Sequence, residues 1–236
     1  MCCNKRDKER QVKLNIIKCD SEPQWGNMYI LREEKHCILI DPNVVNVELL
    51  NECQIEYIFL THEHYDHISG VDYWKNKTNA KVVASKECNI GMQNSGINLS
   101  NTFQQFCAIQ TVRNIDLEKI QNVDYACKAD IVYDHSLEIN WHGNDIHFFA
   151  LPGHSRGSSG ILVNEKDLFA GDSLLKDYPV TGCFPGSSKD DWQQISIPKL
   201  KILEEEIHVY PGHFEDFYLK NYRFWDECLF RRARRK

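Results

Sequence analysis

The sequence predicts an α/β protein (α+β layered) in which short buried strands and amphipathic helices form layers. Three observations predict this class. Apolar runs of strand length recur along the chain between turn residues. Three other stretches carry apolar residues at helical spacing. The chain has 236 residues, 42% of them hydrophobic and 26% charged, so it can bury a sizeable core and has a globular composition.

The first half of the chain alternates strands with helices. Two apolar runs flank the charged residues 32–35, as in a β-hairpin, and Asp41-Pro42 ends the second run. The expected strands are 12–19, 28–31, 37–40, 57–60 and 80–84, and the expected helices are 44–53 and 71 to 76–79. A third helix is expected at 216–229, where five apolar residues recur on one side.

A cluster of histidines follows the strand expected at 57–60. Side chains alternate along an extended chain, so His62, His64 and Asp66 would point to one side and Glu63 to the other. His67 follows at once, where the chain is expected to turn into a helix. Imidazoles and carboxylates are preferred ligands of zinc and similar divalent ions. The sequence therefore predicts a metal site here; the alternative is a solvated loop that is rich in histidine.

The second half of the chain repeats one pattern, in which an apolar run leads into a candidate metal ligand. The runs 145–151, 168–170 and 207–210 lead into His154, Asp172 and His213, respectively. Pro-Gly or Gly before each ligand indicates a sharp turn at the strand end. Strand ends are rigid supports, so ligands placed there can converge at little cost in ordering.

Charge and hydropathy limit the other partners. The net charge of −6 gives no general reason to expect nucleic acid, and no apolar run is long enough to cross a bilayer. The N-terminus lacks the apolar segment of a secretory signal, so a cytoplasmic location is expected. Several of the ten cysteines, such as Cys37, fall in apolar runs and are expected to be reduced core residues.

One domain is expected to span residues 1–236. Residues 1–11 are interpreted as a disordered tail and 86–135 as a flap or insertion, with plain surface decoration as the alternative. The basic residues 231–236 are interpreted as a solvated tail, although such tails also bind nucleic acid. Five further histidines are expected to be surface or structural residues rather than ligands: His36, His135, His142, His147 and His208.

The candidate ligands together resemble those of the metallo-β-lactamase superfamily, and Gly171-Asp172-Ser173 resembles the hydroxyacylglutathione hydrolase (glyoxalase II)-like branch, here without its C-terminal helical domain. The resemblance implies an αββα sandwich, in which two mixed sheets pack face to face between outer helices, with a two-metal site at one edge. It implies one metal on His62, His64 and His154, a second on Asp66, His67 and His213, and Asp172 bridging both.

The activity that this resemblance implies is hydrolysis. Two divalent cations, zinc or else iron or manganese, would share a hydroxide that cleaves a small-molecule thioester, ester or lactone. Asp66 would also orient the water or carry a proton. Lys176 and Tyr178, which follow the bridging aspartate, would either bind a polar substrate group or pack the loop. The alternatives are a phosphodiesterase or nuclease, an iron-dependent oxidoreductase, and a non-catalytic binding module. The sequence does not indicate an oligomeric state.

Overall fold

The first sheet is built mainly from the N-terminal half of the chain. The computed structural model describes residues 14–19, 21–22, 24–44, 48–109 and 115–230. The order of strands in this sheet is β1 (Asn15–Cys19), β2 (Met28–Glu33), β3 (His36–Ile40), β4 (Gln54–Phe59), β5 (Lys81–Ser85) and β6 (Ile131–Tyr133). Strands β1 to β3 are antiparallel, and β3 to β6 are parallel. Because β3 and β4 are parallel, their carboxyl ends lie at the same edge of the sheet.

The second sheet comes from the C-terminal half. Its strand order is β13 (Phe217–Tyr218), β12 (His208–Pro211), β10 (Asp167–Gly171), β9 (Ser159–Val163), β8 (Asn144–Ala150) and β7 (Ser136–Trp141). Strands β10 and β12 are parallel, and the other neighbours are antiparallel. A separate pair is formed by β11 (Val180–Gly182) and β14 (Cys228–Phe230). Both large sheets are therefore mixed, as the family resemblance implies.

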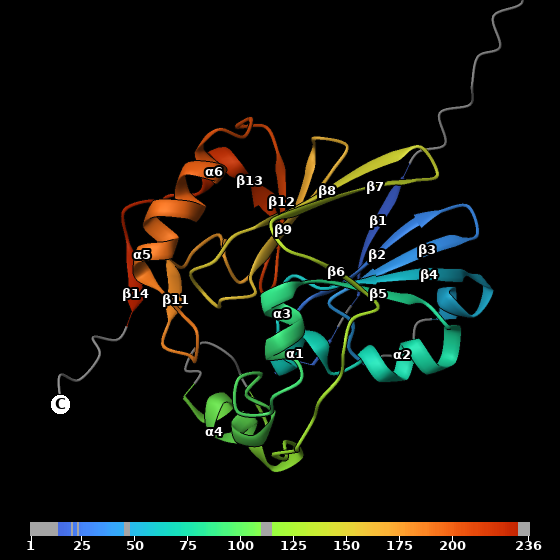
Figure 1. The fold of residues 1–236 in the computed structure, drawn as a ribbon, viewed down its shortest axis with the longest axis horizontal. Helices are drawn as coiled ribbons and strands as arrows, with labels where there is room; N and C mark the ends of the chain where they lie inside the picture. The colour runs from blue at the N-terminus through green and yellow to red at the C-terminus, as the bar shows by residue number, and fades with distance from the viewer. Residues whose placement is uncertain (1–13, 20, 23, 45–47, 110–114, 231–236) are drawn as a thin grey trace, which may run out of the picture.

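Helices lie outside the two sheets (Figure 1). On the first sheet these are α2 (Val71–Thr78) and α3 (Lys86–Gly91), and at its edge α1 (Tyr65–Ile68) and α4 (Phe103–Ala108). The second sheet is covered by α5 (Lys189–Asp191), the π-helical turn η4 (Trp192–Ser196) and α6 (Ile197–Lys201). Short 3₁₀ turns complete the fold: η1 (Glu48–Glu52), η2 (Ser100–Thr102), η3 (Leu117–Lys119) and η5 (Leu219–Asn221). In the part of the chain that the structure describes, no helix has the length and apolar character that crossing a membrane requires.

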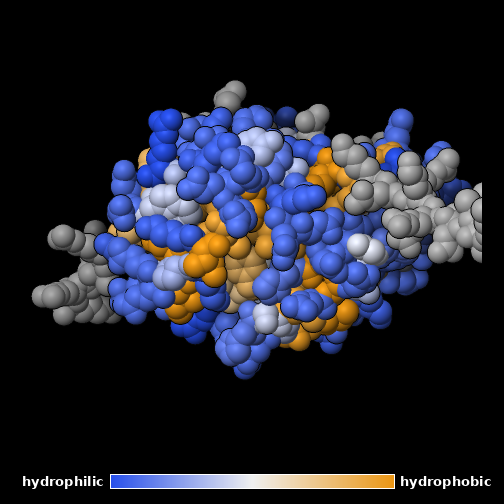
Figure 2. Space-filling view, turned by 90° about the horizontal axis from the view of Figure 1, so that it is seen from above, coloured by the Kyte–Doolittle hydropathy of each residue, from blue (hydrophilic) through white to orange (hydrophobic). Residues whose placement is uncertain are grey.

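Three apolar layers hold these elements together. Phe59, Phe148 and Phe169 belong to the layer between the two sheets. Trp74 of α2 packs on the outer face of the first sheet, and Trp192 of η4 packs on the outer face of the second. The αββα sandwich is thus confirmed, because each sheet buries both of its faces. On the side seen from above, apolar residues reach the surface in patches that polar residues interrupt (Figure 2).

Most expected elements are present with small shifts of their ends. The strands expected at 12–19, 57–60 and 80–84 correspond to β1, β4 and β5, although residues 12 and 13 lie outside the described part. The helix expected from residue 71 is α2. The prediction of a helix at 44–53 is wrong for the residues that the structure describes, because Glu48–Glu52 form the short 3₁₀ turn η1. Residues 45–47 lie outside the described part of the chain.

The helix expected at 216–229 is also wrong. This segment forms β13 and η5, and it reaches β14 through a stretch without regular structure. Phe217 pairs with Val209, and Cys228 pairs with Val180. Of the apolar residues that suggest a helical face, Phe217, Tyr222 and Trp225 pack instead on the outer side of the second sheet, whereas Tyr218 and Leu229 are exposed. Pairing with distant strands therefore overrides the local periodicity.

Candidate metal centre

The site lies at the edge where the strand ends of both sheets meet. Strand β4 leads into His62, and the parallel strands β10 and β12 lead into Asp172 and His213. The turns after β10 and β12 are joined by a hydrogen bond of 2.8 Å from the amide of Gly212 to the carbonyl of Gly171. An added Cβ at Gly212 would lie 2.2 Å from Oδ1 of Asp172, so the close approach of these turns requires glycine.

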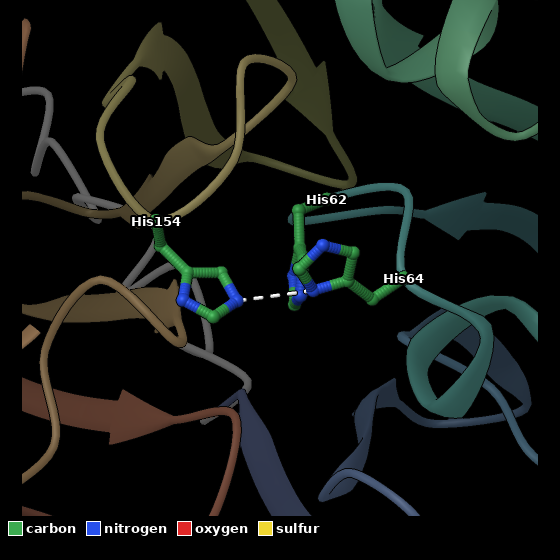
Figure 3. A group of neighbouring side chains, drawn as sticks. All are labelled: His62, His64 and His154. Atoms are coloured by element: carbon green, nitrogen blue, oxygen red, sulfur yellow. Dashed lines mark hydrogen bonds between the residues drawn. The ribbon is translucent and has the colours of Figure 1, made fainter. Parts of the chain in front are cut away.

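One group of three histidines forms half of the site. His62, His64 and His154 are all buried, and each offers one ligand atom within 4.8 Å of the others. Nδ1 of His64 lies 3.0 Å from Nε2 of His154, as the dashed line in Figure 3 shows. Two ligands on one tetrahedral zinc ion are about 3.3 Å apart. The structure therefore brings together the three residues that the family resemblance places on one metal.

A second group lies next to the first. Asp66, His67 and His213 are buried and also offer ligand atoms within 4.8 Å of one another. Nε2 of His213 is 3.2 Å from Oδ2 of Asp66, and Nε2 of His67 is 3.7 Å from the same oxygen. These are again residues that the family resemblance assigns to one metal.

Asp172 lies between the two groups. Its Oδ2 is 3.6 Å from Nε2 of His154 and 3.5 Å from Nε2 of His213, and its Oδ1 is 3.5 Å from Nε2 of His67. One carboxylate thus faces ligands of both groups. This is the position that a bridging ligand would occupy.

Buried atoms in the site lack the partners that burial normally requires. Within the described residues, Nε2 of His62, Nε2 of His67 and Oδ1 of Asp172 have no hydrogen-bond partner. Buried polar atoms without a partner are costly and rare. Nitrogen and carboxylate lone pairs converging on one space are the donor set of borderline divalent cations. The residues present therefore fit a pair of such ions.

Contacts outside these groups fix the orientation of the rings. Asp41, at the end of β3, lies with Oδ2 3.0 Å from Nδ1 of His67 and also accepts hydrogen bonds from the amide and hydroxyl of Thr61. Nδ1 of His154 donates to the carbonyl of Thr181 at 2.8 Å. These contacts turn Nε2 of His67 and of His154 into the site, as outer contacts do in metal centres.

The first sheet anchors the turn that carries His213. The side-chain amide of Asn27 donates to the carbonyls of Pro211 and Phe214, at 3.0 Å each. The hydroxyl of Tyr29 donates to the carbonyl of Pro211 at 2.7 Å. Because these donors come from the other sheet, packing of the two sheets positions this ligand.

The buried charges shift the pKa values of the site. Burial, together with neighbouring histidines, lowers the pKa of His62 well below its ordinary value and that of His64 to about 3. Burial lowers the pKa of His154 as well. Burial also opposes the charge of His67, but nearby carboxylates, Asp66 first, outweigh it and raise the pKa to about 9. Three histidines are therefore neutral at pH 7, as metal binding requires.

The pKa values of the two aspartates in the site are lowered, whereas burial alone would raise them. Burial raises the pKa of Asp66 and of Asp172, but the surrounding histidines lower it by more, so both carboxyls stay below their ordinary range. Glu63 differs because burial dominates and raises its pKa to about 7. Its carboxylate points away from the metal ligands and accepts a hydrogen bond of 2.9 Å from the hydroxyl of Ser155. Glu63 therefore ties the histidine loop to the His154 loop.

Aromatic rings form one wall of the site. The ring of Phe184 lies 5.0 Å from that of His64 and 5.2 Å from that of His154. Phe106 of α4 contacts Phe184 at 5.3 Å, which brings part of segment 86–135 beside the site. Phe184 and Phe106 therefore line the same side of the site. Ser188, four residues after Phe184, caps α5 by accepting a hydrogen bond from the amide of Asp191.

The two predicted substrate contacts differ in their surroundings. The half-buried ring of Tyr178 packs 4.8 Å from Phe214, the residue after His213. Lys176 is exposed, and within the described residues it makes no hydrogen bond or ion pair with the seven candidate ligands. The sequence analysis missed Asp41, although a signal was present, because Asp41 also follows an apolar strand directly.

Comparisons with known proteins identify the family of this chain. A family model described as the metallo-beta-lactamase superfamily matches residues 25–213. The chain is 24% identical over 212 residues to the hydroxyacylglutathione hydrolase of Pelagibacter ubique (strain HTCC1062), which covers 86% of this chain and 71% of that relative. It is 24% identical over 203 residues to a probable polyketide biosynthesis zinc-dependent hydrolase of Bacillus subtilis (strain 168), which covers 80% of this chain and 73% of the relative.

Solved structures share the fold. The crystal structure of TTHA1623 in a di-iron-bound form matches with a TM-score of 0.62 at 20% sequence identity, over 87% of this chain and 96% of that one. The chain spans 62% to 71% of the length of several hydroxyacylglutathione hydrolases. The family model covers most of the chain, including every candidate ligand. The chain therefore belongs to the metallo-beta-lactamase superfamily.

Proposed function

We propose that the protein is a metal-dependent hydrolase with a binuclear centre that cleaves a small thioester, ester or lactone. His62, His64 and His154 would hold one divalent cation, Asp66, His67 and His213 the other, and Asp172 both. The observation that supports this most strongly is the position of Asp172, whose two oxygens face Nε2 of His154 and Nε2 of His67. The names of the relatives, two of them hydrolases, point to the same reaction class.

The protein's own residues would bind, orient and exclude water around the reacting bond. The two cations would lower the pKa of a water molecule and polarise the substrate oxygen. Asp66 stays a carboxylate, because its pKa is held below the usual range, and so one of its oxygens would orient the water by accepting a hydrogen bond from it. Asp41 would keep the His67 ring fixed through Nδ1. The rings of Phe184 and Phe106 would exclude bulk water from one side.

The walls of the site favour an acyl substrate over a polyanion. Phosphodiesters of nucleic acids are bound mainly by lysine and arginine. Here the contacts of His64 and His154 on one side are with the Phe184 ring, and Lys176 has no interaction with the ligand set among the described residues. An apolar ring suits the acyl or thiol part of a small substrate. The basic residues 231–236, which support a nuclease, lie outside the described residues.

Zinc is the metal we propose first. Five histidines and two carboxylates suit zinc, and iron and manganese accept the same ligands. One relative is named a zinc-dependent hydrolase, and one related structure holds two iron ions. A cytoplasmic location, a flap role for residues 86–135, and substrate contacts by Lys176 and Tyr178 remain predictions.

The test combines metal analysis with a substrate screen. Purified protein is stripped with a chelator, reloaded separately with Zn²⁺, Fe²⁺ or Mn²⁺, and assayed on thioesters, lactones and bis(p-nitrophenyl) phosphate. We expect turnover of a thioester, ester or lactone that depends on two ions in the buried centre. Turnover of the phosphodiester alone would contradict the proposed substrate class, and failure of the centre to load would contradict the hydrolase itself.

A substitution at the bridge tests the assignment of ligands. Asp172→Ala is expected to retain the fold but to lose metal from the buried centre and at least about 1,000-fold of the activity, since both cations lose a ligand. The matched control is Asp177→Ala, an exposed aspartate five residues along the same loop. Full activity of Asp172→Ala would refute the bridging role.

A further inference from the structure

We propose that His36, Glu56 and His142 form a second metal site, which binds a borderline divalent cation such as Zn²⁺. The sequence analysis interprets both histidines as surface or structural residues. The structure instead places them on one carboxylate, and each of the three residues offers a ligand atom within 4.8 Å of the others. Two imidazoles and a carboxylate are a recurring set of protein ligands for zinc.

The ligand atoms face a common point. Nδ1 of His36 lies 2.6 Å from Oε1 of Glu56, and Nε2 of His142 lies 3.4 Å from the same oxygen. The centroids of the two imidazole rings are 4.2 Å apart. Neighbouring ligands on a zinc ion are about 3.3 Å apart, so His142 has this spacing already and His36 needs to move by less than about 1 Å.

The backbone directs these side chains to each other by special local geometry. Glu56 is the extra residue of a β-bulge in β4, because Cys37 pairs with Ile55 while Ile38 pairs with Tyr57. Bulges change the direction of a side chain and are common near functional sites. His142 lies in the β7–β8 turn with a positive φ of 50°, followed by Gly143 at 83°. Such a two-residue turn is typical of a hairpin.

An outer contact holds the carboxylate. The indole N–H of Trp141 donates to Oε2 of Glu56 at 2.8 Å, while Oε1 faces Nδ1 of His36 and both oxygens lie within 3.4 Å of Nε2 of His142. A donor of this kind orients a carboxylate ligand in many metal centres. Partial burial opposes the charge of Glu56, but the hydrogen bonds from Trp141, His36 and His142 together lower its pKa, so the carboxylate is ionised at neutral pH.

The proposed site is separate from the centre at His62. His142 precedes β8, whereas His154 follows it, and the seven residues of β8 span about 20 Å. Figure 1 shows the β7–β8 turn beside the β2–β3 hairpin, on the side of the sheets away from α1. The two sites therefore share no ligand.

The exposure of the side chains allows a cation to enter from solvent. The side chains of His36, Glu56 and His142 are 34%, 21% and 36% exposed. Three protein ligands leave one tetrahedral position for water. His36 and Glu56 belong to the first sheet and His142 to a turn of the second. A bound ion would therefore join the two sheets and stabilise the folded state.

Metal counting tests the proposal with the full-length protein. After chelation, the protein is reloaded with Zn²⁺, and bound zinc is measured by mass spectrometry and by calorimetry. We expect the double variant His36→Ala/His142→Ala to bind one zinc ion fewer per chain than the unsubstituted protein. Glu56→Gln should lower the affinity for that same ion. Loss of a direct ligand should cost more than the roughly 10- to 100-fold in affinity that loss of an outer contact costs. The matched control is His135→Ala, an exposed histidine at the opposite end of β7 from His142, which should keep the full count.

A second measurement reports on the site directly. Ni²⁺ quenches nearby indole fluorescence, and Trp141 contacts Glu56, so we expect quenching that His142→Ala removes and His135→Ala retains. An equal zinc count and equal quenching in all variants would overturn the proposal, and the cluster would then be a hydrogen-bonded group only. If the buried centre fails to load, the total falls in every variant, but the difference of one ion persists. Failure of this site and failure of the proposed hydrolase are therefore distinguishable.

Discussion

Oδ2 of Asp41 lies 3.0 Å from Nδ1 of His67, and both side chains are buried. The carboxylate is itself held by the amide and hydroxyl of Thr61, one residue before His62. One aspartate at the end of β3 thus positions the start of the histidine loop and the ring at its end. Nε2 of His67 consequently faces the site.

Asp41→Asn should weaken metal binding without unfolding the protein. The amide keeps the size of the side chain but loses the charge that stabilises the His67 ring. We expect the affinity of the buried centre to fall by about 10- to 100-fold, as for outer contacts in other metal sites. Zinc titration against a competing chelator measures this. Asp130→Asn, which removes an aspartate that contacts Lys75 away from the site, is the control and should bind zinc normally.

Gly212→Ala should damage both stability and metal binding. The new Cβ would lie 2.2 Å from Oδ1 of Asp172 and 2.8 Å from Cε1 of His67, so the turn has to move. We expect unfolding to become easier by about 1–3 kcal/mol, the usual cost of overpacking. Urea denaturation of the metal-free protein measures it. Gly96→Ala has its closest contact at 3.3 Å, with a side-chain atom, and should be close to neutral. Equal stability of both variants would contradict the tight packing.

Phe184→Ala should change substrate preference. If the ring contacts the acyl part of the substrate, its removal should raise KM for bulky apolar acyl groups by about tenfold, in line with the energy of an aromatic contact. An acetyl group is too small to reach the wall, so its KM should stay nearly constant. Kinetics on a series of acyl chain lengths measures this. Phe224→Ala, a half-buried ring on the outer side of the second sheet, is the control. Uniform loss across the series would place Phe184 in a structural role.

The metal-free protein should be most stable near pH 6.5. Burial lowers the pKa values of His62, His64 and His154, so below pH 6.5 the unfolded chain binds more protons than the folded chain. The free energy of unfolding therefore decreases as the pH is lowered below 6.5. The pKa of His67 shifts in the opposite direction, so its contribution to stability depends on pH in the opposite way. Its pKa is raised to about 9, so its contribution is full below pH 6.5 and is lost as the pH rises through 9.

Denaturation of chelator-treated protein between pH 5 and pH 9.5 checks this profile. His67→Asn should lose the decline on the alkaline side and keep the decline on the acid side, because Asn does not titrate. A profile that rises steadily toward pH 9 in the unsubstituted protein would contradict the direction assigned to His67.

The sequence alone determined the elements that carry the site. Each candidate ligand follows an apolar run, and those runs are β4, β8, β10 and β12. Strand periodicity and turn residues are local properties, so they can be recognised without knowing which strands pair. The resemblance of the ligand motifs then predicted the αββα sandwich, and the two mixed sheets confirm it.

The sequence predictions that were wrong or incomplete concern residues whose structure depends on distant partners. Residues 216–229 have helical spacing, but Phe217 pairs with Val209 and Cys228 with Val180, so strand pairing with distant segments decides their structure. The role of Asp41 was missed for a related reason. Its partner His67 is 26 residues away, and only the parallel pairing of β3 and β4 brings the two together.

The amino-acid sequence therefore determined which side chains can bind cations, because ligand chemistry and the ends of strands can be recognised from local sequence. Tertiary structure decided which of them meet. Asp172 lies between two ligand groups, and His36 and His142 reach Glu56, because sheet packing and a bulge bring together residues that are far apart in the sequence. These long-range contacts depend on the free energy of the whole fold, which cannot be read from a local sequence pattern.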